Sequence, residues 1–319
     1  MVLCTSCGKR KAVIVVKSRG EALCKECFLR KFKDLVIKAL TDARLTGGLG
    51  SKLVAVATSG GKDSSNALYV LNELKQTYGF DLIAIMVNEG IKGYRELKAK
   101  ALRKLCKKLN VELIEVNLRK EVGVDIDEVA LLYERGLIPF KPCTVCGVLR
   151  RYLVSLYAKE LGANYVATGH NLDDEIQTFV MNLIRGDLRA IAREGIITSP
   201  GPEDVIPRFK PLYYITERES MAYFILRGLM TPHVECPYAK LSMRYKIRSL
   251  INYAEYRYPG SKYRLLKLKE EIKAKVEMPR TALRKCTICG MPSSRHICRA
   301  CEMKEEISKA LRELKLSKF

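Results

Sequence analysis

The chain has 319 residues and a mass of 36.1 kDa, enough for one large domain with attachments or for two domains. With 48% hydrophobic and 29% charged residues it can bury a core, which excludes general disorder. It has no apolar run near the roughly 18 residues of a membrane span and does not begin like a signal peptide, so we expect a cytoplasmic protein. The formal charge of +22 favours a polyanionic partner: nucleic acid, anionic lipid or nucleotide.

The cysteines predict metal sites. Ten of the twelve form five CxxC pairs, and only Cys106 and Cys236 stand alone. In a chain of this size, repeated CxxC pairs indicate metal binding rather than a disulfide scaffold. Two Gln, no Trp and many Lys, Arg and Glu favour a thermophilic source.

The first predicted module is an N-terminal zinc ribbon. Its two CxxC pairs have the spacing of a Cys4 zinc site, with a strand expected over 12–16 between them. The ligands would be Cys4, Cys7, Cys24 and Cys27. A redox site is the alternative interpretation. A helix over 28–43 is expected to follow.

The middle of the chain alternates strands and helices. Strands are predicted over 52–58, 81–88, 111–118 and 164–168, and helices over 63–76, 94–109, 148–161 and 172–184. This order predicts a doubly wound parallel α/β sheet, with ligands bound beyond the carboxyl ends of its strands, at the loops after Thr58, Asn88 and Thr168. Residues 186–218 are expected to form an irregular surface excursion, and further helices are predicted over 216–227 and 241–256.

The C-terminus carries a second, tighter zinc ribbon. Its ligands would be Cys286, Cys289, Cys298 and Cys301. A short helix should follow, with Ile307, Leu311 and Leu314 on one face. We therefore expect zinc-binding domains at 1–33 and 279–319 around a central domain at 34–278.

A glycine-rich string follows the first central strand and opens a helix. Its residues are Ser59, Gly60, Gly61, Lys62, Asp63 and Ser64. Glycines let the backbone approach an anion, helix N–H groups converge on it, and Lys62 adds positive charge. The spacing differs from that of a Walker A loop. A plain Gly-Gly turn at a helix start is the alternative.

This string resembles the PP-loop of ATP pyrophosphatases, which cleave ATP between the α- and β-phosphates and adenylate a carbonyl oxygen. The resemblance implies that the phosphates are held by Ser59, Gly60, Gly61, Asp63 and Ser64, with Lys62 offsetting their charge. It also implies that Ala57 and Val87 meet the nucleoside.

A second string, from Gly169 to Glu175, follows a later strand. Taken alone it favours a helix start, with Asn171 as N-cap and acidic residues in the first turn. Beside a PP-loop it resembles the GHxxDD element of tRNA thiolases. That resemblance implies that Gly169 lies against ATP and that Asp174 binds Mg²⁺ or assists catalysis.

Three thiols remain once both ribbons are filled and Cys106 is set aside as an inert core residue. Cys143, Cys146 and Cys236 cannot close a tetrahedral zinc site. They could hold a 4Fe-4S cluster with one iron free, or act as redox sulfurs. A CxxC loop without function is the third possibility.

Together these motifs resemble the tRNA 2-thiolation enzymes of the PP-loop superfamily. The strings at 236–239 and 289–294 are most similar to the TtuA type, which thiolates the T-loop thymine at tRNA position 54. The resemblance implies ATP-dependent replacement of a pyrimidine O2 by sulfur, with Mg²⁺, two Zn²⁺ and a 4Fe-4S cluster on Cys143, Cys146 and Cys236. It also implies a ubiquitin-like sulfur carrier with a C-terminal thiocarboxylate, and a homodimer. Arg150 stands where relatives often carry Lys and keeps the positive charge near ATP and the reacting groups.

Residues 240–269 contain nine basic residues, one acid and five tyrosines. This composition predicts a tRNA-binding surface, with a solvated helix face as the alternative. Two other functions stay open: thiolation of the wobble uridine, and a zinc-ribbon nucleic-acid-binding protein with a vestigial ATP site.

Overall fold

Five parallel strands form the central sheet of the computed structural model, which describes residues 2–198, 205–231, 234–276 and 283–316. They are β3 (Leu53–Ala57), β4 (Asp81–Asn88), β5 (Glu112–Asn117), β6 (Tyr165–Thr168) and β7 (Arg208–Phe209). Their order, β5-β4-β3-β6-β7, confirms the doubly wound parallel sheet. The order reverses between β3 and β6, so the loops after these two strands flank the expected ligand position.

Helices cover both faces of the sheet, because successive strand residues point to opposite sides. Val54 and Val56 pack toward one hydrophobic cluster, and Ala55 packs toward the other. The first cluster includes α1 (Lys25–Asp42), α2 (Lys62–Tyr78), α3 (Arg95–Leu109) and α9 (Glu217–Leu226). The second includes α5 (Ile126–Glu134), α6 (Pro142–Glu160) and α12 (Arg299–Leu316). Short α4 (Leu118–Val122) follows β5.

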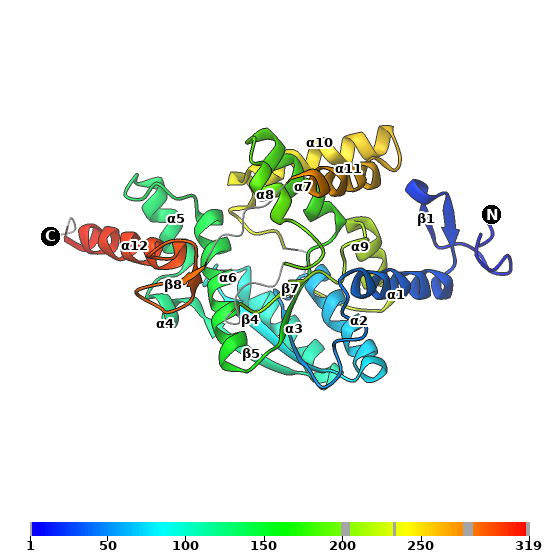
Figure 1. The fold of residues 1–319 in the computed structure, drawn as a ribbon, viewed down its shortest axis with the longest axis horizontal. Helices are drawn as coiled ribbons and strands as arrows, with labels where there is room; N and C mark the ends of the chain where they lie inside the picture. The colour runs from blue at the N-terminus through cyan, green and yellow to red at the C-terminus, as the bar shows by residue number, and fades with distance from the viewer. Residues whose placement is uncertain (1, 199–204, 232–233, 277–282, 317–319) are drawn as a thin grey trace.

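A group of helices lies beside this sandwich (Figure 1). It contains α7 (Leu172–Ile184), α8 (Leu188–Arg193), α10 (Met243–Arg257) and α11 (Ser261–Lys275). Its buried side chains include Leu172 and Ile176 of α7, Ile247 and Ile251 of α10, and Leu266 of α11. A 3-10 turn, η2 (Ala239–Leu241), leads into α10. This packing fixes α10 against the helix that begins with the second motif.

Several sequence-based boundaries were wrong. Helix α6 begins at Pro142 rather than Val148, so the central CxxC lies in a first helical turn and not in a loop. Pro at the first helical position is a known start signal, because its missing N–H has no helical partner there. The segment expected to be irregular contains α8 and β7. The C-terminal helix is 18 residues long rather than short.

The terminal modules lie at opposite ends of the molecule (Figure 1). The N-terminal one is a hairpin of β1 (Ile14–Val16) and β2 (Glu21–Leu23), with the 3-10 turn η1 (Lys17–Arg19) between them. Arg19 ties it to the body by an ion pair with Glu219 and by donating to the hydroxyl of Tyr263 (2.6 Å). The C-terminal module pairs β8 (Arg284–Lys285) with β9 (Pro292–Ser293).

The C-terminal helix α12 packs on the body of the protein. Ile307 is buried with α5 and α6, and Leu311 and Leu314 pack at the edge of the same cluster, which confirms the predicted face. The proposed domain boundary at 33 and 34 stays a prediction and falls inside α1. The boundary at 278 and 279 lies outside the described residues. No helix in the described ranges is long and apolar enough to cross a membrane.

Candidate active site

The PP-loop connects β3 to α2 and is closed by its own serines. The amide N–H of Ser59 donates to Ser64 Oγ (3.1 Å), and the two serine hydroxyls are 3.2 Å apart. Gly61 is the N-cap of α2, so the free N–H groups of the first helical turn face the loop. This arrangement is suited to binding the phosphates of a nucleotide.

Gly60 allows the loop to turn against the backbone of α3. Its φ is +71°, and a Cβ there would lie 2.4 Å from the carbonyl oxygen of Lys98. Gly136 has nearly the same φ, +70°, but nothing lies within 4 Å of its added Cβ. The two glycines share a backbone conformation and differ in the space around an added Cβ, which makes them a matched pair for the steric effect.

We predict that Gly136→Ala costs about 1 kcal/mol of stability, the usual penalty of this backbone region for a side chain. Gly60→Ala should cost about 2–4 kcal/mol, because the clash with Lys98 adds to that penalty. It should also weaken ATP binding. Chemical denaturation and nucleotide titration measure the two effects. Equal stability losses in both variants would contradict a steric role for Gly60.

Lys62 is held by carboxylates in this structure. Its ammonium donates to Asp63 (2.8 Å) and to Glu217 of α9 (3.1 Å). Asp63 also accepts the hydroxyl of Ser220 (2.6 Å). Two cavities adjoin this loop, and among the described residues Ser59, Gly61, Asp63 and Ser64 line one or both of them, whereas Gly60 and Lys62 line neither. To offset phosphate charge, Lys62 would have to leave Glu217.

A cavity of about 240 Å³ opens at the PP-loop. The predicted nucleoside contacts Ala57 and Val87 line it, and so does Gly169 from the loop after β6. A Cβ on Gly169 would lie 2.7 Å from both N and Cα of Ser64. The second motif thus lies directly against the PP-loop, and only glycine permits that approach.

The three acidic residues of the second motif have different partners in the structure. Asp173 and Glu175 are buried and paired with lysines: Asp173 with Lys262, and Glu175 with Lys269 (2.9 Å) and Lys210 (2.6 Å). Asp173 and Asp174 both line the larger cavity, but Asp174 faces an arginine, Arg244, rather than a buried lysine. The predicted N-cap is also confirmed, since Asn171 and Asp174 form a reciprocal capping box. Asp174 therefore caps the start of α7 and lines the cavity at the same time.

Asp174 sits in an environment that disfavours its charge. Burial raises the pKa of Asp174 to about 6, although the Arg244 guanidinium 3.4 Å away opposes the rise. Arg244 also donates to the carbonyl of Asp174 (3.0 Å) and to Thr178 (2.8 Å). A carboxyl that titrates near neutral pH is suited to accepting a proton.

The larger cavity, of about 380 Å³, is lined by all three central thiols. Cys143 and Cys146 come from the first turn of α6, and Cys236 comes from the segment before η2. Cys143 Sγ donates to the carbonyl of Tyr238 (3.1 Å). Burial raises the pKa of all three thiols, that of Cys146 to about 12. Ionised sulfur here therefore requires a nearby positive charge or a metal.

The two cavities adjoin. Asp63, Gly147 and Arg150 line both of them, so one arginine borders the PP-loop cavity and the thiol cavity alike. Arg150 also pairs with Glu89 (3.3 Å). The cysteines thus lie beside the predicted nucleotide site, as the sequence-based hypothesis requires.

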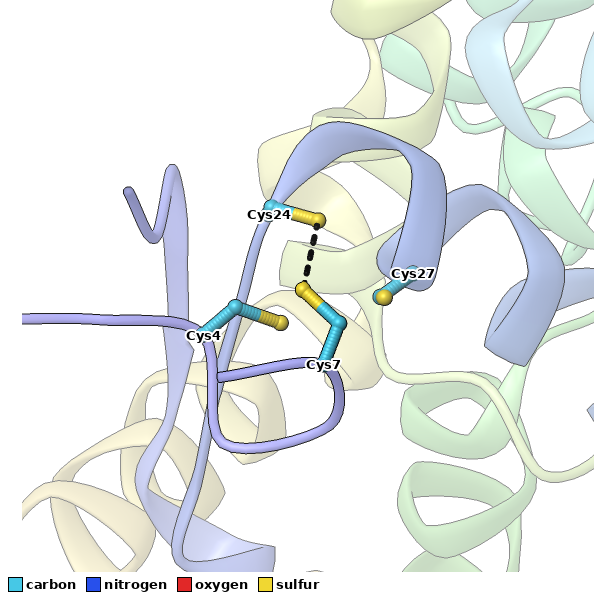
Figure 2. A group of neighbouring side chains, drawn as sticks. All are labelled: Cys4, Cys7, Cys24 and Cys27. Carbon is cyan, nitrogen blue, oxygen red and sulfur yellow. Dashed lines mark hydrogen bonds between the residues drawn. The ribbon is translucent and has the colours of Figure 1, made fainter. Parts of the chain in front are cut away.

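The terminal cysteine groups are tighter than the central one. Within each, the four sulfurs all lie within 4.8 Å of one another. Figure 2 shows the N-terminal sulfurs turned toward a common centre, with Cys7 and Cys24 Sγ 4.0 Å apart. With Zn–S bonds near 2.3 Å, a tetrahedral zinc needs sulfurs about 3.8 Å apart. Both terminal groups fit one such ion.

Among the described residues, the three central sulfurs do not all lie within 4.8 Å of one another, as the sulfurs of each terminal group do. This arrangement fits a cluster better than a single ion, because each thiolate of a cluster binds a different iron. Cys106 lies in neither cavity and is buried in the core, where burial raises its pKa to about 11. Its expected inert position is confirmed.

Glu89 and Arg95 are site residues that sequence reasoning missed. Both are almost fully buried, form an ion pair with each other and line the thiol cavity. Arg95 also donates to the carbonyl of Ser59 (2.8 Å). A chain of contacts therefore runs from the PP-loop through Arg95 and Glu89 to Arg150. The position of Glu89 just after β4, at the carboxyl edge of the sheet, was the available signal.

The predicted tRNA-binding stretch divides into two parts. Lys262 and Lys269 are buried partners of Asp173 and Glu175, so these two cannot contact RNA. Tyr263 is half-buried, and its hydroxyl bonds within the body. Tyr245, Tyr253, Tyr256 and Tyr258 are exposed. The stretch is therefore not one continuous RNA-binding surface. The lysines of α11 are buried because they pair with Asp173 and Glu175, which lie far away in the sequence.

Comparison with known proteins agrees with this geometry. The profile of the PP-loop domain family matches residues 28–235, and that of the N-terminal LIM domain of the 2-thiouridine synthetase TtuA matches residues 3–29. The chain is 32% identical to the tRNA-5-methyluridine(54) 2-sulfurtransferase of Thermus thermophilus, over 99% of this chain and 95% of the relative. It is 34% identical to cytoplasmic tRNA 2-thiolation protein 1 of Aspergillus niger, over 96% and 89%.

A solved structure is similar along nearly the whole chain. It is the U34-tRNA thiolase NcsA from Methanococcus maripaludis with its 4Fe-4S cluster, at 33% identity and a TM-score of 0.82, covering 96% of both chains. Fold, motifs and relatives agree: the chain belongs to the PP-loop family and, within it, to the group of the tRNA 2-thiolation enzymes.

Proposed function

We propose that this protein is an ATP-dependent tRNA 2-sulfurtransferase, which replaces the O2 of a pyrimidine base by sulfur. One observation carries the proposal: the cavity of Cys143, Cys146 and Cys236 shares Asp63, Gly147 and Arg150 with the cavity of the PP-loop. Activation by ATP and delivery of sulfur could therefore occur at one base without its release. The names of the Thermus and Aspergillus relatives support tRNA as the substrate.

The first step is activation of the base. O2 attacks the α-phosphorus of ATP, the bond to the β-phosphate breaks, and pyrophosphate leaves. The base loses its N3 proton, and we assign that proton to Asp174, whose carboxyl lines the cavity. The N–H groups at the start of α2, Lys62 and Arg150 would offset the phosphate charge. Sulfur at the oxidation level of sulfide then forms a bond to C2 as the C2–O bond breaks. AMP leaves with the former O2, and the proton held by Asp174 returns to N3.

We propose Asp63 as the ligand of Mg²⁺, and binding of the ion by Asp174 is the alternative to the proton-accepting role that we assign to it. Both carboxylates line the thiol cavity, and Asp63 lines the nucleotide cavity as well. Carboxylate oxygens are the donors that Mg²⁺ prefers, together with substrate phosphates and water. The ion would neutralise charge on the leaving pyrophosphate.

Cys143, Cys146 and Cys236 would hold a 4Fe-4S cluster, as the solved NcsA structure carries one. When bound, such a cluster supplies an open iron, a soft metal that coordinates sulfide. Sulfur carried as a persulfide on the same cysteines is the chemical alternative. The two routes differ in whether the active enzyme contains iron.

The modified nucleoside is proposed to be the T-loop thymine at position 54. The strings at 236–239 and 289–294 support this choice, while the similarity to NcsA supports the wobble uridine. Mass spectrometry of tRNA fragments, after anaerobic reaction with ATP and a sulfide source, decides between them. A wild-type enzyme that releases no pyrophosphate from ATP and tRNA would instead support a binding protein with a vestigial ATP site.

The remaining assignments follow from the resemblance. We propose Zn²⁺ in both terminal Cys4 groups, where each ion would stabilise a module with few buried residues of its own. The sulfur donor would be a ubiquitin-like carrier with a C-terminal thiocarboxylate, and the enzyme would act as a homodimer. A cytoplasmic location is supported by the name of the Aspergillus relative.

Asp174→Asn should slow catalysis without lowering the stability of the folded protein. The ionised carboxyl is the proton acceptor, so kcat/KM of the wild type should fall below pH 6, the pKa to which burial raises Asp174. The variant should be about 100- to 10,000-fold slower, and its kcat/KM should not show this fall at acidic pH. Because the folded pKa lies above the ordinary 3.8, the charge of Asp174 lowers stability as pH rises through 6.

The variant should therefore unfold at no lower temperature than the wild type at pH 7. Steady-state kinetics between pH 5 and 8, with thermal unfolding alongside, test both statements. If kcat/KM of Asp174→Asn still fell below pH 6 as it does in the wild type, this carboxyl would be excluded as the group that titrates.

A further inference from the structure

Helix α10 presents a row of tyrosines to solvent. Tyr253 and Tyr256 are 65% and 78% exposed, and Tyr245, at 38%, lies on the same face because the three fall within one side of a helix with 3.6 residues per turn. The opposite face carries Ile247 and Ile251, which are buried against α7. The row spans about 16 Å along the helix axis. Exposed apolar side chains that gather on one face, unlike ones scattered singly, mark an interaction site.

The charge around this row is positive. Lys246 and Arg257 are exposed on the same helix. The one acid of α10, Glu255, turns away and accepts the N–H groups of Gly260 (2.8 Å) and Lys262 (2.9 Å) at the start of α11. The tyrosine face therefore combines aromatic surface with cations, and the exposed carboxylate near its start, Glu235, lies 3.7 Å from Arg248. A polyanion with flat bases matches that combination better than an acidic protein surface does.

The row begins at the thiol cavity. Tyr245 lines that cavity together with Arg244 and Arg248 from the same turn of α10. Arg248 reaches inward and pairs with Glu217 (2.9 Å), the residue that also holds Lys62. A strand of nucleotides that follows the row would thus end beside the PP-loop and the central cysteines.

We infer that Tyr245, Tyr253 and Tyr256 stack on unpaired nucleotides that flank the target base, so that the enzyme selects loop RNA over duplex RNA. This inference rests on the proposed function and adds the class of RNA and the residues that read it. Stacking on aromatic side chains requires bases that are splayed out of a helix, and it tolerates different base identities. Lys246 and Arg257 would contact the backbone phosphates.

The test separates stacking from charge. Binding of the intact protein to tRNA is measured by fluorescence anisotropy at several KCl concentrations. Tyr253→Ala with Tyr256→Ala should weaken binding about 10-fold or more at every concentration and leave the salt slope unchanged. Lys246→Ala with Arg257→Ala should reduce that slope, because fewer counterions are released. Tyr253→Phe with Tyr256→Phe keeps the rings and should bind like the wild type.

An RNA of the same length that is fully paired supplies the second comparison. Its binding should be weaker and insensitive to the tyrosine substitutions. Unchanged binding of tRNA by the double Ala variant would overturn the inference. A smaller assembly of that variant in sedimentation would also overturn it, because the tyrosine row would then lie between copies of the chain. Thiolation by the wild type is assayed separately. Its absence would refute the proposed function but not the stacking, which binding alone reports.

Discussion

Replacing Cys143 by Ala is expected to lower the rate of tRNA thiolation by more than about 100-fold, since loss of an outer partner of a metal ligand alone costs 10- to 100-fold. The thiol of Cys143 lines the larger cavity and none of the PP-loop cavity. ATP should therefore bind to the variant as it binds to the wild type. The measurement is anaerobic thiolation, followed by mass spectrometry of the tRNA nucleosides.

Cys106→Ala is the matched control. Cys106 is also a buried cysteine, but it belongs to the core and lies in neither cavity. Its loss should lower stability through the small void it leaves and should leave thiolation intact. A Cys143→Ala enzyme that thiolates tRNA at the wild-type rate would refute both the cluster and the persulfide route.

The largest loss of stability is expected for Arg95→Met. This substitution leaves Glu89, which is 1% exposed, with only Arg150 at 3.3 Å, and it removes the donor to the Ser59 carbonyl. Removing one partner of a buried ion pair costs about 3–5 kcal/mol, because the remaining charge stays buried. Nucleotide binding should weaken as well, since Ser59 belongs to the PP-loop.

The matched control is the exposed pair of Arg103 and Glu115 (2.6 Å), whose arginine side chain is 58% exposed. Arg103→Met should cost less than about 1 kcal/mol. The double variant Arg95→Met with Glu89→Leu should recover part of the loss, because the buried carboxylate is removed together with its buried partner. Denaturant unfolding measures all four proteins. Similar losses for Arg95→Met and Arg103→Met would show that Glu89 is not held mainly by Arg95.

Local patterns predicted most of the central fold. The strand at 81–88 and the helix at 172–184 have the predicted bounds, because the strand is a nearly continuous apolar run and the helix begins after the N-cap Asn171. Strand β7 is only two residues long, so it has no period to detect. Helix α5 was missed altogether, although Asp125 and Glu128 form a capping box, a signal that the sequence contains.

The roles of charged residues were harder to predict. Lys262 and Lys269 read as surface cations in the sequence, and only the packing of α11 against α7 reveals their buried partners. Arg95 likewise lies in a helix of ordinary composition, and its burial depends on the PP-loop and β4. The cysteine pairs were easier, because ligand spacing within the chain already limits the geometry of a metal site.

The central claim is that the three unpaired thiols beside the PP-loop hold an iron–sulfur cluster that serves sulfur transfer. The most direct test is metal and acid-labile sulfide analysis of the anaerobically purified, active enzyme. We predict about four iron atoms, about four sulfides and about two zinc ions per chain. Cys143→Ala should lose the iron and sulfide and keep the zinc. An active wild-type enzyme without iron, or with a third zinc in its place, would contradict the claim.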